Sequence, residues 1–322
     1  MSEPSFHSPD RFARLGVVVV NYGSSGLIES NLGPLAATLP GATIVVVDNF
    51  TTTAEKDAID ALTRRRGWRA VLSPVNLGFG GGNNLGVADA REAGASRFLL
   101  LNPDASITAD AVETLLARVD EDELTLVAPR VLRPDGSEWF AGSDLYLADG
   151  RIRSARRRPE HAGASREEWL SGACLLVSAD LWSRVAGFDE RFFLYWEDVD
   201  LSHRVLQAGG SLEVVAAASA IHAEGGTQGV GHDSRGQPKS TRYYYFNIRN
   251  RLLFAALHLD ERAARRWRRL AVPVAWEVLL QGGRRQFLRS PKVIVAGIRG
   301  VVDGLALGRD LADYPQPAGR GD

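Results

Sequence analysis

The stretch Leu15-Gly-Val-Val-Val-Val20 decides the fold class of this chain. It is a short β-branched run without polar alternation, which is typical of a strand buried on both faces of a sheet. Similar runs alternate with helical patterns over the next 80 or so residues. Strands are expected at 42–48, 68–72 and 97–101, and helices at 27–38, at 54–66 and from a Gly/Asn loop at 76–84 to about residue 93. This alternation predicts a mostly parallel sheet with helices on its faces.

The pattern changes after residue 126. Turn signals at Pro134-Asp-Gly136 and Asp149-Gly150 predict antiparallel hairpins, and the Arg-rich segment 151–166 predicts a mobile loop. Further strands are expected at 169–177 and 212–217, helices at 179–185 and 199–208, a Gly-rich lid at 224–240, and helices from 243 to about 311 with breaks near Leu259, Gly282 and Pro291.

The charge is unevenly distributed along the chain. The net charge of −1 argues against a nucleic-acid partner. Residues 261–299 are nevertheless strongly basic, with Glu261 and Glu277 as their only acids. The side chains of Arg262, Arg265, Arg266 and Arg269 share one helical face. Such a face fits an anionic membrane, a solvated surface or a second subunit of a homodimer.

The remaining composition favours a cytoplasmic protein. Cys174 is the only cysteine, so no internal disulfide can form, and its apolar surroundings favour a buried residue over a nucleophile. The first ten residues lack the basic start and apolar core of a signal peptide. We therefore expect a cytoplasmic location, at the inner face of the plasma membrane if the basic helices bind lipid.

Polar residues stand where four apolar runs end. They are Asn21 with Tyr22, Asp48 with Asn49, Asn76, and Asn102 with Asp104. Each could merely turn the chain or cap a helix. In open α/β sheets, however, ligands bind beyond the carboxyl ends of the strands. The four positions together therefore predict one polar ligand site.

The glycine-rich loop from Asn76 to Gly86 is not a dinucleotide fingerprint. The G-x-G-x-x-G pattern that starts at Gly78 and Gly80 requires glycine where this chain has Asn83, and the loop follows the third strand instead of the first. A glycine loop at a helix start can still bring backbone N–H groups close to a base, ribose or phosphate.

The segment Tyr195-Trp-Glu-Asp-Val-Asp-Leu-Ser-His-Arg204 concentrates carboxylates. Asp200 and Arg204 are four residues apart, so a helical ion pair accounts for both. Asp198 has no opposite charge at helical spacing and is free to act as a general base, although a negatively charged first helical turn would also explain the acids. Asp104 suits Mg²⁺ or Mn²⁺, and His222 as a second ligand would favour Mn²⁺.

The order of these motifs resembles that of the inverting family 2 glycosyltransferases, which have the GT-A fold. The Asn-Pro-Asp form at 102–104 and the pattern Phe-Phe-x-Tyr-x-Glu-Asp-x-Asp-Leu at 192–201 are most similar to the rhamnosyltransferase branch of cell-wall and O-antigen synthesis. The resemblance covers about residues 15–255. The motifs are Val19-Val-Asn-Tyr22, Val47-Asp-Asn49, Asn76-Leu-Gly-Phe-Gly80 with Asn83-Asn84, Leu101-Asn-Pro-Asp104, Ser171-Gly172, Gly187-Phe-Asp189, Glu197-Asp-Val-Asp200 and His222.

This resemblance implies roles for individual residues. Asp198 would be the catalytic base, with Glu197 beside it, and Asp104 with His222 would hold the divalent cation, although Asn102 replaces the first acid of the family's metal motif. Gly172, Trp196 and Tyr245 would face the acceptor. The nucleotide sugar would contact Asn21, Tyr22, Asp48, Asn49, Asn76, Gly78, Phe79, Asn83, Asn102 and Arg249.

The resemblance also implies a fold, partners and a domain organisation. It implies a GT-A-type sheet with a smaller antiparallel part and C-terminal helices, a nucleotide-sugar donor (dTDP-rhamnose favoured, UDP- or GDP-sugars open), and a glycan or polyprenyl-diphosphate-linked acceptor. The segments would be a disordered lead at 1–14, the catalytic domain at 15–225, a lid and acceptor-side segment at 226–260 and a basic helical extension at 261–322. Two alternatives are a sugar-nucleotide pyrophosphorylase, which would need a basic loop after the first strand, and a non-catalytic sugar-nucleotide-binding module.

Overall fold

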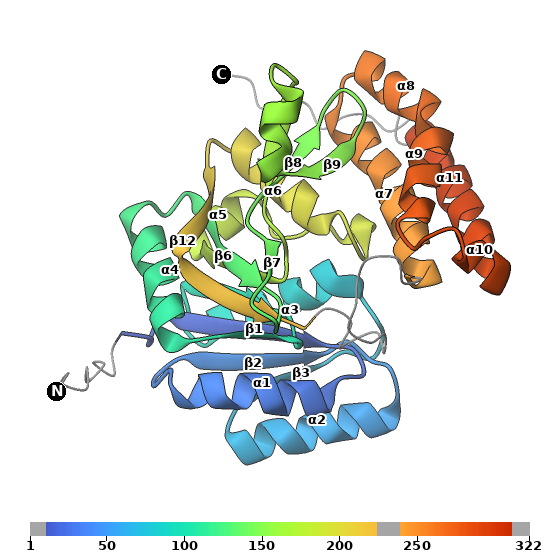
Figure 1. Ribbon diagram of the computed structural model, residues 1–322. Helices are drawn as coiled ribbons and strands as arrows, with labels where there is room; N and C mark the ends of the chain where they lie inside the picture. The colour runs from blue at the N-terminus through green and yellow to red at the C-terminus, as the bar shows by residue number, and fades with distance from the viewer. Residues whose placement is uncertain (1–10, 224–238, 311–322) are drawn as a thin grey trace. The chain divides into compact units, whose positions relative to one another are not determined.

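The computed structural model describes residues 11–223 and 239–310 (Figure 1). The chain divides into two compact units. Among the described residues, the first unit comprises 11–143, 168–193 and 197–223, and the second comprises 144–167, 194–196 and 239–310. The segment predicted as the catalytic domain therefore contains two pieces, 144–167 and 194–196, that belong to the second unit. Residues 1–10 of the predicted disordered lead at 1–14 and most of the predicted lid at 224–240 lie outside the described residues, whereas residues 11–14 are described and Phe12 is fully buried.

A nine-stranded sheet forms the centre of the first unit. Its order is β3-β2-β1-β4-β11-β6-β12-β5, with β7 paired to β6. The strands are β1 (Leu15–Asn21), β2 (Thr43–Asp48), β3 (Arg69–Leu72), β4 (Arg97–Leu101), β5 (Ala105–Ile107), β6 (Thr125–Leu132), β7 (Glu138–Phe140), β11 (Cys174–Ser178) and β12 (Ser211–His222). β1 to β4 are mutually parallel, whereas β11 runs antiparallel to both β4 and β6. The predicted α/β class, with a parallel half and an antiparallel part, is confirmed.

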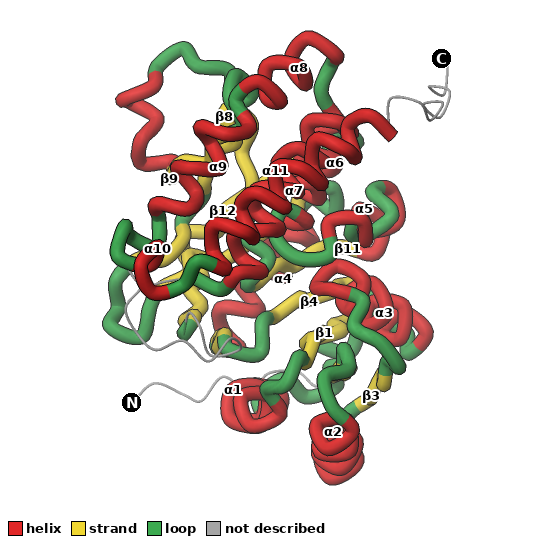
Figure 2. The backbone as a smooth tube through the Cα atoms, turned by 90° about the vertical axis from the view of Figure 1, so that its right-hand side faces the viewer, coloured by secondary structure: helices red, strands yellow, loops and turns green. Residues whose placement is uncertain are grey.

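Helices cover both faces of this sheet because β1 is apolar on both sides. Val17 and Val19 pack with Ile28 of α1, whereas Val18 and Val20 pack with Val87 of α3. Figures 1 and 2 show α1 and α2 together on one face. Each buried valine contributes roughly 1.5–3 kcal/mol relative to an exposed one. The helices are α1 (Ser25–Ala37), α2 (Thr53–Arg66) and α4 (Ala109–Glu121) on one face, and α3 (Gly78–Glu92), α5 (Ala179–Arg184) and α6 (Glu197–Gln207) on the other, with the short helix η2 (Glu190–Phe192) before α6.

The glycine run in α3 is explained by close packing against β1. A Cβ atom on Gly82 would lie 2.7 Å from Val20, and one on Gly86 would lie 2.3 Å from Val18. Both distances are below any van der Waals contact, so only glycine lets α3 approach the strand this closely. Gly78 has φ +77° and sits against the carbonyl of Phe193, where any side chain would clash. Helix–sheet packing, which the sequence did not suggest, therefore accounts for Gly82 and Gly86, whereas Gly78 is required by its backbone conformation and by the Phe193 carbonyl.

The second unit contains the C-terminal helices, in which α7 packs along α11 (Figure 2). Tyr244 and Ile248 of α7 form its core with Leu279 of α9 and Val293 of α11. The predicted breaks near 259, 282 and 291 are confirmed. The helices are α7 (Thr241–His258), α8 (Glu261–Arg269), α9 (Ala271–Leu280), α10 (Gln286–Arg289) and α11 (Lys292–Asp310). Within the described residues, no helix combines the length and apolarity needed to cross a bilayer.

A three-stranded sheet, in the order β10-β8-β9, begins where the chain leaves the first unit. It contains β8 (Ser143–Tyr146), β9 (Arg151–Ser154) and β10 (Arg166–Trp169), with the short helix η1 (Ala155–His161) in between. The prediction of a mobile loop at 151–166 was therefore wrong. The arginine-rich composition misled it, because Arg158 forms two hydrogen bonds of 2.7 and 2.8 Å to the fully buried carboxylate of Asp144 and so orders the segment.

Candidate active site at the carboxyl edge of the sheet

The strand order brings the predicted polar residues to one edge of the sheet. β1 lies between β2 and β4, so the chain winds in opposite directions from β1, which is the position where open α/β sheets bind ligands. Asn21 and Asp48 are paired neighbours at the ends of β1 and β2. The N–H of Asn102, just after β4, donates to the carbonyl of Ala173 at 3.0 Å, so the loop that holds Asp104 lies beside the turn that holds Gly172.

A buried carboxylate lies at the β1–β2 end of this edge. The Asn21 amide donates to Oδ1 of Asp48 at 2.9 Å, while Oδ2 of Asp48 has no hydrogen-bond partner among the described residues. Burial raises the pKa of Asp48 above its ordinary value. Glu55, which the sequence analysis did not identify, accepts a 2.6 Å hydrogen bond from the N–H of Ser25 and a 3.3 Å bond from Asn21. The signal was present as a helix-capping pattern, Thr52-x-x-Glu55, whose glutamate here reaches another helix.

The asparagines after β2 and β3 shape the turn into α3. Asn49 accepts from the N–H of Leu77 at 2.8 Å and donates to the carbonyl of Gly78 at 2.7 Å. Asn76 accepts from the N–H of Gly78 at 2.8 Å, and Asn83 donates to the carbonyl of Phe79 at 3.0 Å. These side chains use their polar groups on the backbone and fix the position of Phe79. Their direct contact with a nucleotide, like that of the half-buried Tyr22, stays a prediction.

Asp198 is held beside Gly172 and Phe79, although the three residues are distant in sequence. The N–H of Gly172 donates to Oδ2 of Asp198 at 3.0 Å. A Cβ atom on Gly172 would lie 3.1 Å from the Phe79 ring and 3.6 Å from the Cβ of Asp198. Gly172 therefore lets an aromatic ring and a carboxylate come together around one backbone N–H group.

Burial gives the acid pair at the start of α6 unusual proton affinities. It raises the pKa of Asp198 to about 6, against the opposing effect of the Gly172 hydrogen bond. The pKa of Glu197 is raised well above its ordinary value by burial and by the charge of Asp198, and its Oε2 has no hydrogen-bond partner among the described residues. Asp200 instead pairs with Arg204 at 2.8 Å, as its spacing predicts. Asp198 is thus an acid that ionises close to neutral pH, which suits a general base.

Asp104 and His222 form a buried pair at the same edge. Nε2 of His222 lies 3.0 Å from Oδ1 of Asp104, because β12 ends beside β5 with His222 opposite Ala105. The ring centre of Trp139, which the sequence analysis did not identify, lies 4.6 Å from that of His222. Trp139 stands on β7, which pairs antiparallel with β6 as the turn signal at Pro134-Asp-Gly136 predicts, whereas its contact with His222 depends on β12, which is distant in the chain.

The Asp104–His222 pair fits part of a cation's coordination shell. Their 3.0 Å separation matches neighbouring ligands on an octahedral ion with bonds of about 2.1 Å. Asn102 stands two residues before Asp104 in the sequence. Its side-chain oxygen Oδ1 is buried and has no hydrogen-bond partner within the described ranges. In the described part of the chain, no group of three or more His, Cys, Asp or Glu side chains could hold a metal alone. A cation bound here would therefore complete its shell with oxygens of a ligand or water.

Three predicted site residues belong to the second unit. Trp196 is 5% exposed and packs against Phe254 and Trp267, so its side chain is part of a hydrophobic core, a role that the sequence did not indicate. The hydroxyl of Tyr245 donates to Asp303 at 2.7 Å. Arg249 donates to Oδ1 of Asn250 at 2.5 Å, and burial lowers its pKa. The predicted contacts of these three residues with donor or acceptor stay predictions.

Comparison with known proteins identifies the class. Residues 17–171 match the family model "Glycosyl transferase family 2". N-acetylglucosaminyl-diphospho-decaprenol L-rhamnosyltransferase of Mycobacterium tuberculosis is 29% identical over 233 residues, which cover 65% of this chain and 75% of that protein. Rhamnosyltransferase WbbL of Escherichia coli K12 is 27% identical over 222 residues, covering 64% and 82%. The mannosyltransferase PcManGT of Pyrobaculum calidifontis has a TM-score of 0.53 at 14% identity, covering 94% and 88%.

The resemblance found in the sequence is therefore confirmed. The protein is a glycosyltransferase with a family 2 domain and the GT-A fold, and its relatives include two bacterial rhamnosyltransferases.

Replacing Asp198 by Asn should stabilise the folded protein at neutral pH. The pKa of Asp198 is about 6 in the folded protein and exceeds the ordinary value of 3.8, so the ionised carboxylate lowers the free energy of unfolding. The full loss of stability is present above about pH 6, and none of it remains below about pH 4. Asn carries no charge and can still accept from Gly172. The melting temperature of the variant should exceed that of the wild type at about pH 7.5, and the difference should vanish towards about pH 4. A difference that is the same at every pH would contradict the raised pKa.

Proposed function

We propose that the protein transfers a sugar, with inversion, from a nucleoside-diphosphate donor to a hydroxyl group of a glycan or lipid-linked acceptor, with Asp198 as the general base. The single observation that carries this proposal is the environment of Asp198. Its carboxylate is held by the Gly172 N–H at 3.0 Å and has a pKa of about 6, and Gly172 stands in a turn beside the loop that holds Asp104. Family membership supplies the reaction class.

The mechanism is one displacement at the anomeric carbon. Asp198 accepts the proton of the acceptor hydroxyl while that oxygen attacks the carbon on the face opposite the diphosphate. The bond between the carbon and the phosphate oxygen breaks, the diphosphate leaves with the bonding electrons, and the configuration inverts without a covalent intermediate. A carboxylate with a pKa of about 6 is ionised at neutral pH and is more basic than an ordinary aspartate. Such a base contributes roughly 10²–10⁴-fold to the rate.

A divalent cation would be held by Asp104 and His222 and would stabilise the negative charge that develops on the leaving diphosphate. An imidazole ligand favours Mn²⁺ over Mg²⁺. The structure of the Pyrobaculum mannosyltransferase is of its complex with GDP-Man and Mn²⁺, which supports a cation in this fold. The rhamnosyltransferase relatives support dTDP-rhamnose as the donor, and the name of the mycobacterial relative supports an acceptor linked to a polyprenyl diphosphate.

Asp198→Asn tests the base directly. Loss of the proton acceptor should lower kcat by about 10²–10⁴-fold, whereas binding of the donor nucleotide should be retained because the shape of the side chain is unchanged. The measurement is release of nucleoside diphosphate from dTDP-rhamnose with and without a lipid-linked glycan acceptor, alongside the thermal shift caused by dTDP. The exposed Asp180, another acid in the first turn of a helix, provides the matched control Asp180→Asn, which should keep full activity.

Three outcomes would contradict the proposal. Retained turnover in Asp198→Asn would reject the base assignment. A wild-type protein that binds nucleotide sugar but releases no diphosphate would favour the non-catalytic binding module. Formation of nucleotide sugar from a nucleoside triphosphate and sugar phosphate would favour the pyrophosphorylase.

The proposed cation site predicts that binding of the metal and binding of the nucleotide strengthen each other. Mn²⁺ should increase the thermal stabilisation by dTDP in the wild type, because both ligands bind only the folded protein. Asp104→Asn should abolish this increase by removing the charged ligand. Asn102→Asp should strengthen it by adding a second carboxylate, as in the fuller motif of the family. An equal Mn²⁺ effect in all three proteins would place the metal elsewhere.

A membrane-contacting surface on α9 and α11 would bring the enzyme to a lipid-linked acceptor. Two neighbouring helices expose large apolar side chains, at i, i+4 spacing on each helix. They are Val272 and Trp276 on α9 and Ile294, Val295, Ile298 and Val302 on α11. The exposed cations along these segments are Arg284, Arg285, Lys292 and Arg299. Two acids of the same helices are engaged, because Glu277 pairs with Arg151 and Asp303 accepts from Tyr245.

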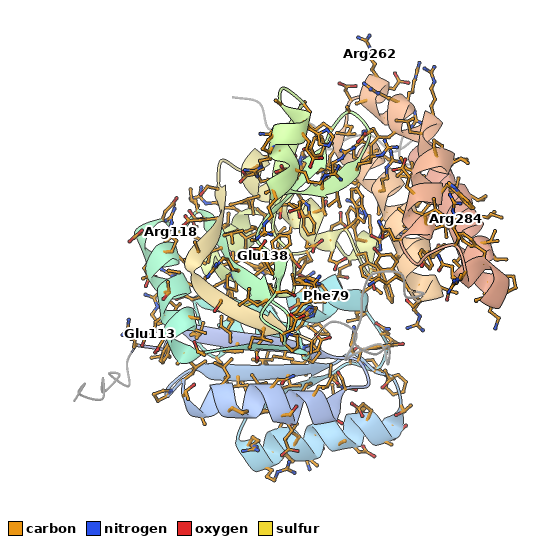
Figure 3. All side chains as sticks on the ribbon, in the orientation of Figure 1. Phe79, Glu113, Arg118, Glu138, Arg262 and Arg284 are labelled. Carbon is orange, nitrogen blue, oxygen red and sulfur yellow. The ribbon has the colours of Figure 1, made fainter. Side chains whose placement is uncertain are left out.

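This arrangement fits a helix pair that lies in the interface of an anionic bilayer. The sequence placed the contact on α8 alone, through Arg262, Arg265, Arg266 and Arg269. Arg262 projects outward from α8 (Figure 3), whereas Arg265 pairs with Glu261. The exposed apolar residues of α9 and α11 add apolar surface that a bilayer would bury, which a charged face by itself lacks.

Vesicle flotation tests this surface. The wild type should bind vesicles with anionic lipid and not neutral ones. The triple variant Trp276→Ser, Val295→Ser, Ile298→Ser should bind at least about tenfold more weakly, because it removes apolar area from the interface. Val75→Ser, at an exposed valine of the first unit, is the control and should bind like the wild type. Unchanged lipid binding by the triple variant would contradict the surface, and a loss of self-association in its place would assign the face to a second copy of the chain.

A further inference from the structure

The backbone directly before the acid pair is strained. Phe193, Tyr195 and Trp196 have φ angles of +62°, +63° and +74°, in the left-handed region. Bulky side chains rarely adopt this conformation, and each such residue costs on the order of 1–3 kcal/mol. Three of the four residues that precede Glu197 are therefore held in place by their surroundings against a local cost. Such strain persists only where other interactions fix the segment.

Asn250 of α7 holds the middle of this segment. Its side-chain nitrogen donates to the carbonyl of Leu194 at 2.9 Å and to that of Tyr195 at 2.7 Å. Its side-chain oxygen accepts from Arg249 at 2.5 Å, which fixes the orientation of the amide. Asn250 is fully buried, so water does not compete for these bonds. One amide group thus satisfies two successive carbonyls of a strained turn.

The two ends of the segment are anchored differently. The carbonyl of Phe193 accepts from the N–H of Phe79 at 2.7 Å. The ring of Trp196 packs against Phe254, which lies one helical turn beyond Asn250 on α7. The Asn250 bonds therefore act on the two peptide groups between these anchors, where rotation would relieve the strain at Tyr195.

Covalent continuity transmits this restraint to the catalytic acid. Asp198 follows Tyr195 by three residues, a chain span of at most about 11 Å. A rotation of the Tyr195 peptide would therefore reorient the first turn of α6. That rotation would lengthen the 3.0 Å bond from Gly172 to Asp198 and admit water to the carboxylate.

We propose that Asn250 is a positioning residue for Asp198. Its paired hydrogen bonds hold the left-handed turn at 193–196 in the conformation that aims the carboxylate at the acceptor hydroxyl. The inference rests on the proposed role of Asp198 as base. Asparagine suits the position because its amide supplies two N–H donors. Leucine has a similar size but no donor, and an aspartate oxygen would face two carbonyl oxygens without a hydrogen bond.

Asn250→Leu removes both donors without adding charge. It should lower kcat by about 100-fold, the cost of a small misplacement of a catalytic group, while KM for the donor changes by less than about threefold. The acidic limb of the pH profile of kcat/KM should move below its wild-type position at about pH 6, because a more hydrated Asp198 has a lower pKa. Asn247→Leu is the matched control, since the Asn247 amide donates to the carbonyl of Tyr243 on its own helix, and it should keep wild-type kcat and pH profile.

A double-mutant cycle separates positioning from general stability. Tyr195→Gly relieves the left-handed strain, because glycine adopts this φ without cost. Asn250→Leu should therefore lower kcat at least about fivefold less in the Tyr195→Gly background than in the wild type. If leucine is not tolerated, Asn250→Ser removes one donor without adding bulk and should show the same coupling with a smaller loss.

The outcomes distinguish this inference from the proposed function. If Asp198→Asn abolishes turnover while Asn250→Leu or Asn250→Ser leaves kcat and the pH profile unchanged, Asn250 is not a positioning residue and the base assignment stands. Equal losses in the wild-type and Tyr195→Gly backgrounds would also overturn the inference. If Asp198→Asn keeps its turnover, the base assignment itself fails.

Discussion

The packing of α3 against β1 is the constraint on which the rest of the first unit depends. β1 is apolar on both faces, so helices must cover it on both sides. On one side the helix approaches so closely that Gly82 and Gly86 cannot carry a Cβ atom. This approach sets the start of α3, and with it the position of Phe79 beside Gly172 and Asp198. A packing requirement between a helix and a strand thereby shapes a site that neither element contains alone.

The site combines burial with restraint, and the two have opposite effects on stability. Burial of Asp198 raises its pKa and costs stability when the carboxylate is ionised, and the left-handed turn at 193–196 adds backbone strain. Hydrogen bonds from Gly172 and Asn250 offset part of this cost. The donors are the backbone N–H of Gly172 and the neutral side-chain amide of Asn250. They orient Asp198 and the turn before it without neutralising the charge of the carboxylate. This combination suits a base that must be both ionised and fixed in position.

The two halves of the proposed chemistry stand on different strands of one edge. Asp104 follows β4 and His222 ends β12, whereas Gly172 precedes β11, the strand that pairs with β4. Because β11 pairs antiparallel with β4, the loop that holds Asp104 and the turn that holds Gly172 lie at the same edge of the sheet. The match of residues 17–171 to the family 2 model makes this edge of the sheet the proposed site of sugar transfer.

The sequence by itself determined the features that depend on local periodicity. The parallel half of the sheet, the helix breaks near 259, 282 and 291, the Asp200–Arg204 pair and the order of family motifs all follow from residues close in the chain. Only the tertiary structure decided which distant groups meet: Glu55 with Asn21, Trp139 with His222, Arg158 with Asp144, and Asn250 with the turn before the acids. The physical reason is that hydrogen bonding and burial between distant segments depend on strand order and helix packing, which leave no periodic signal in the chain. The raised pKa of Asp198 belongs to the second group, because burial is a property of the folded protein and not of the residue.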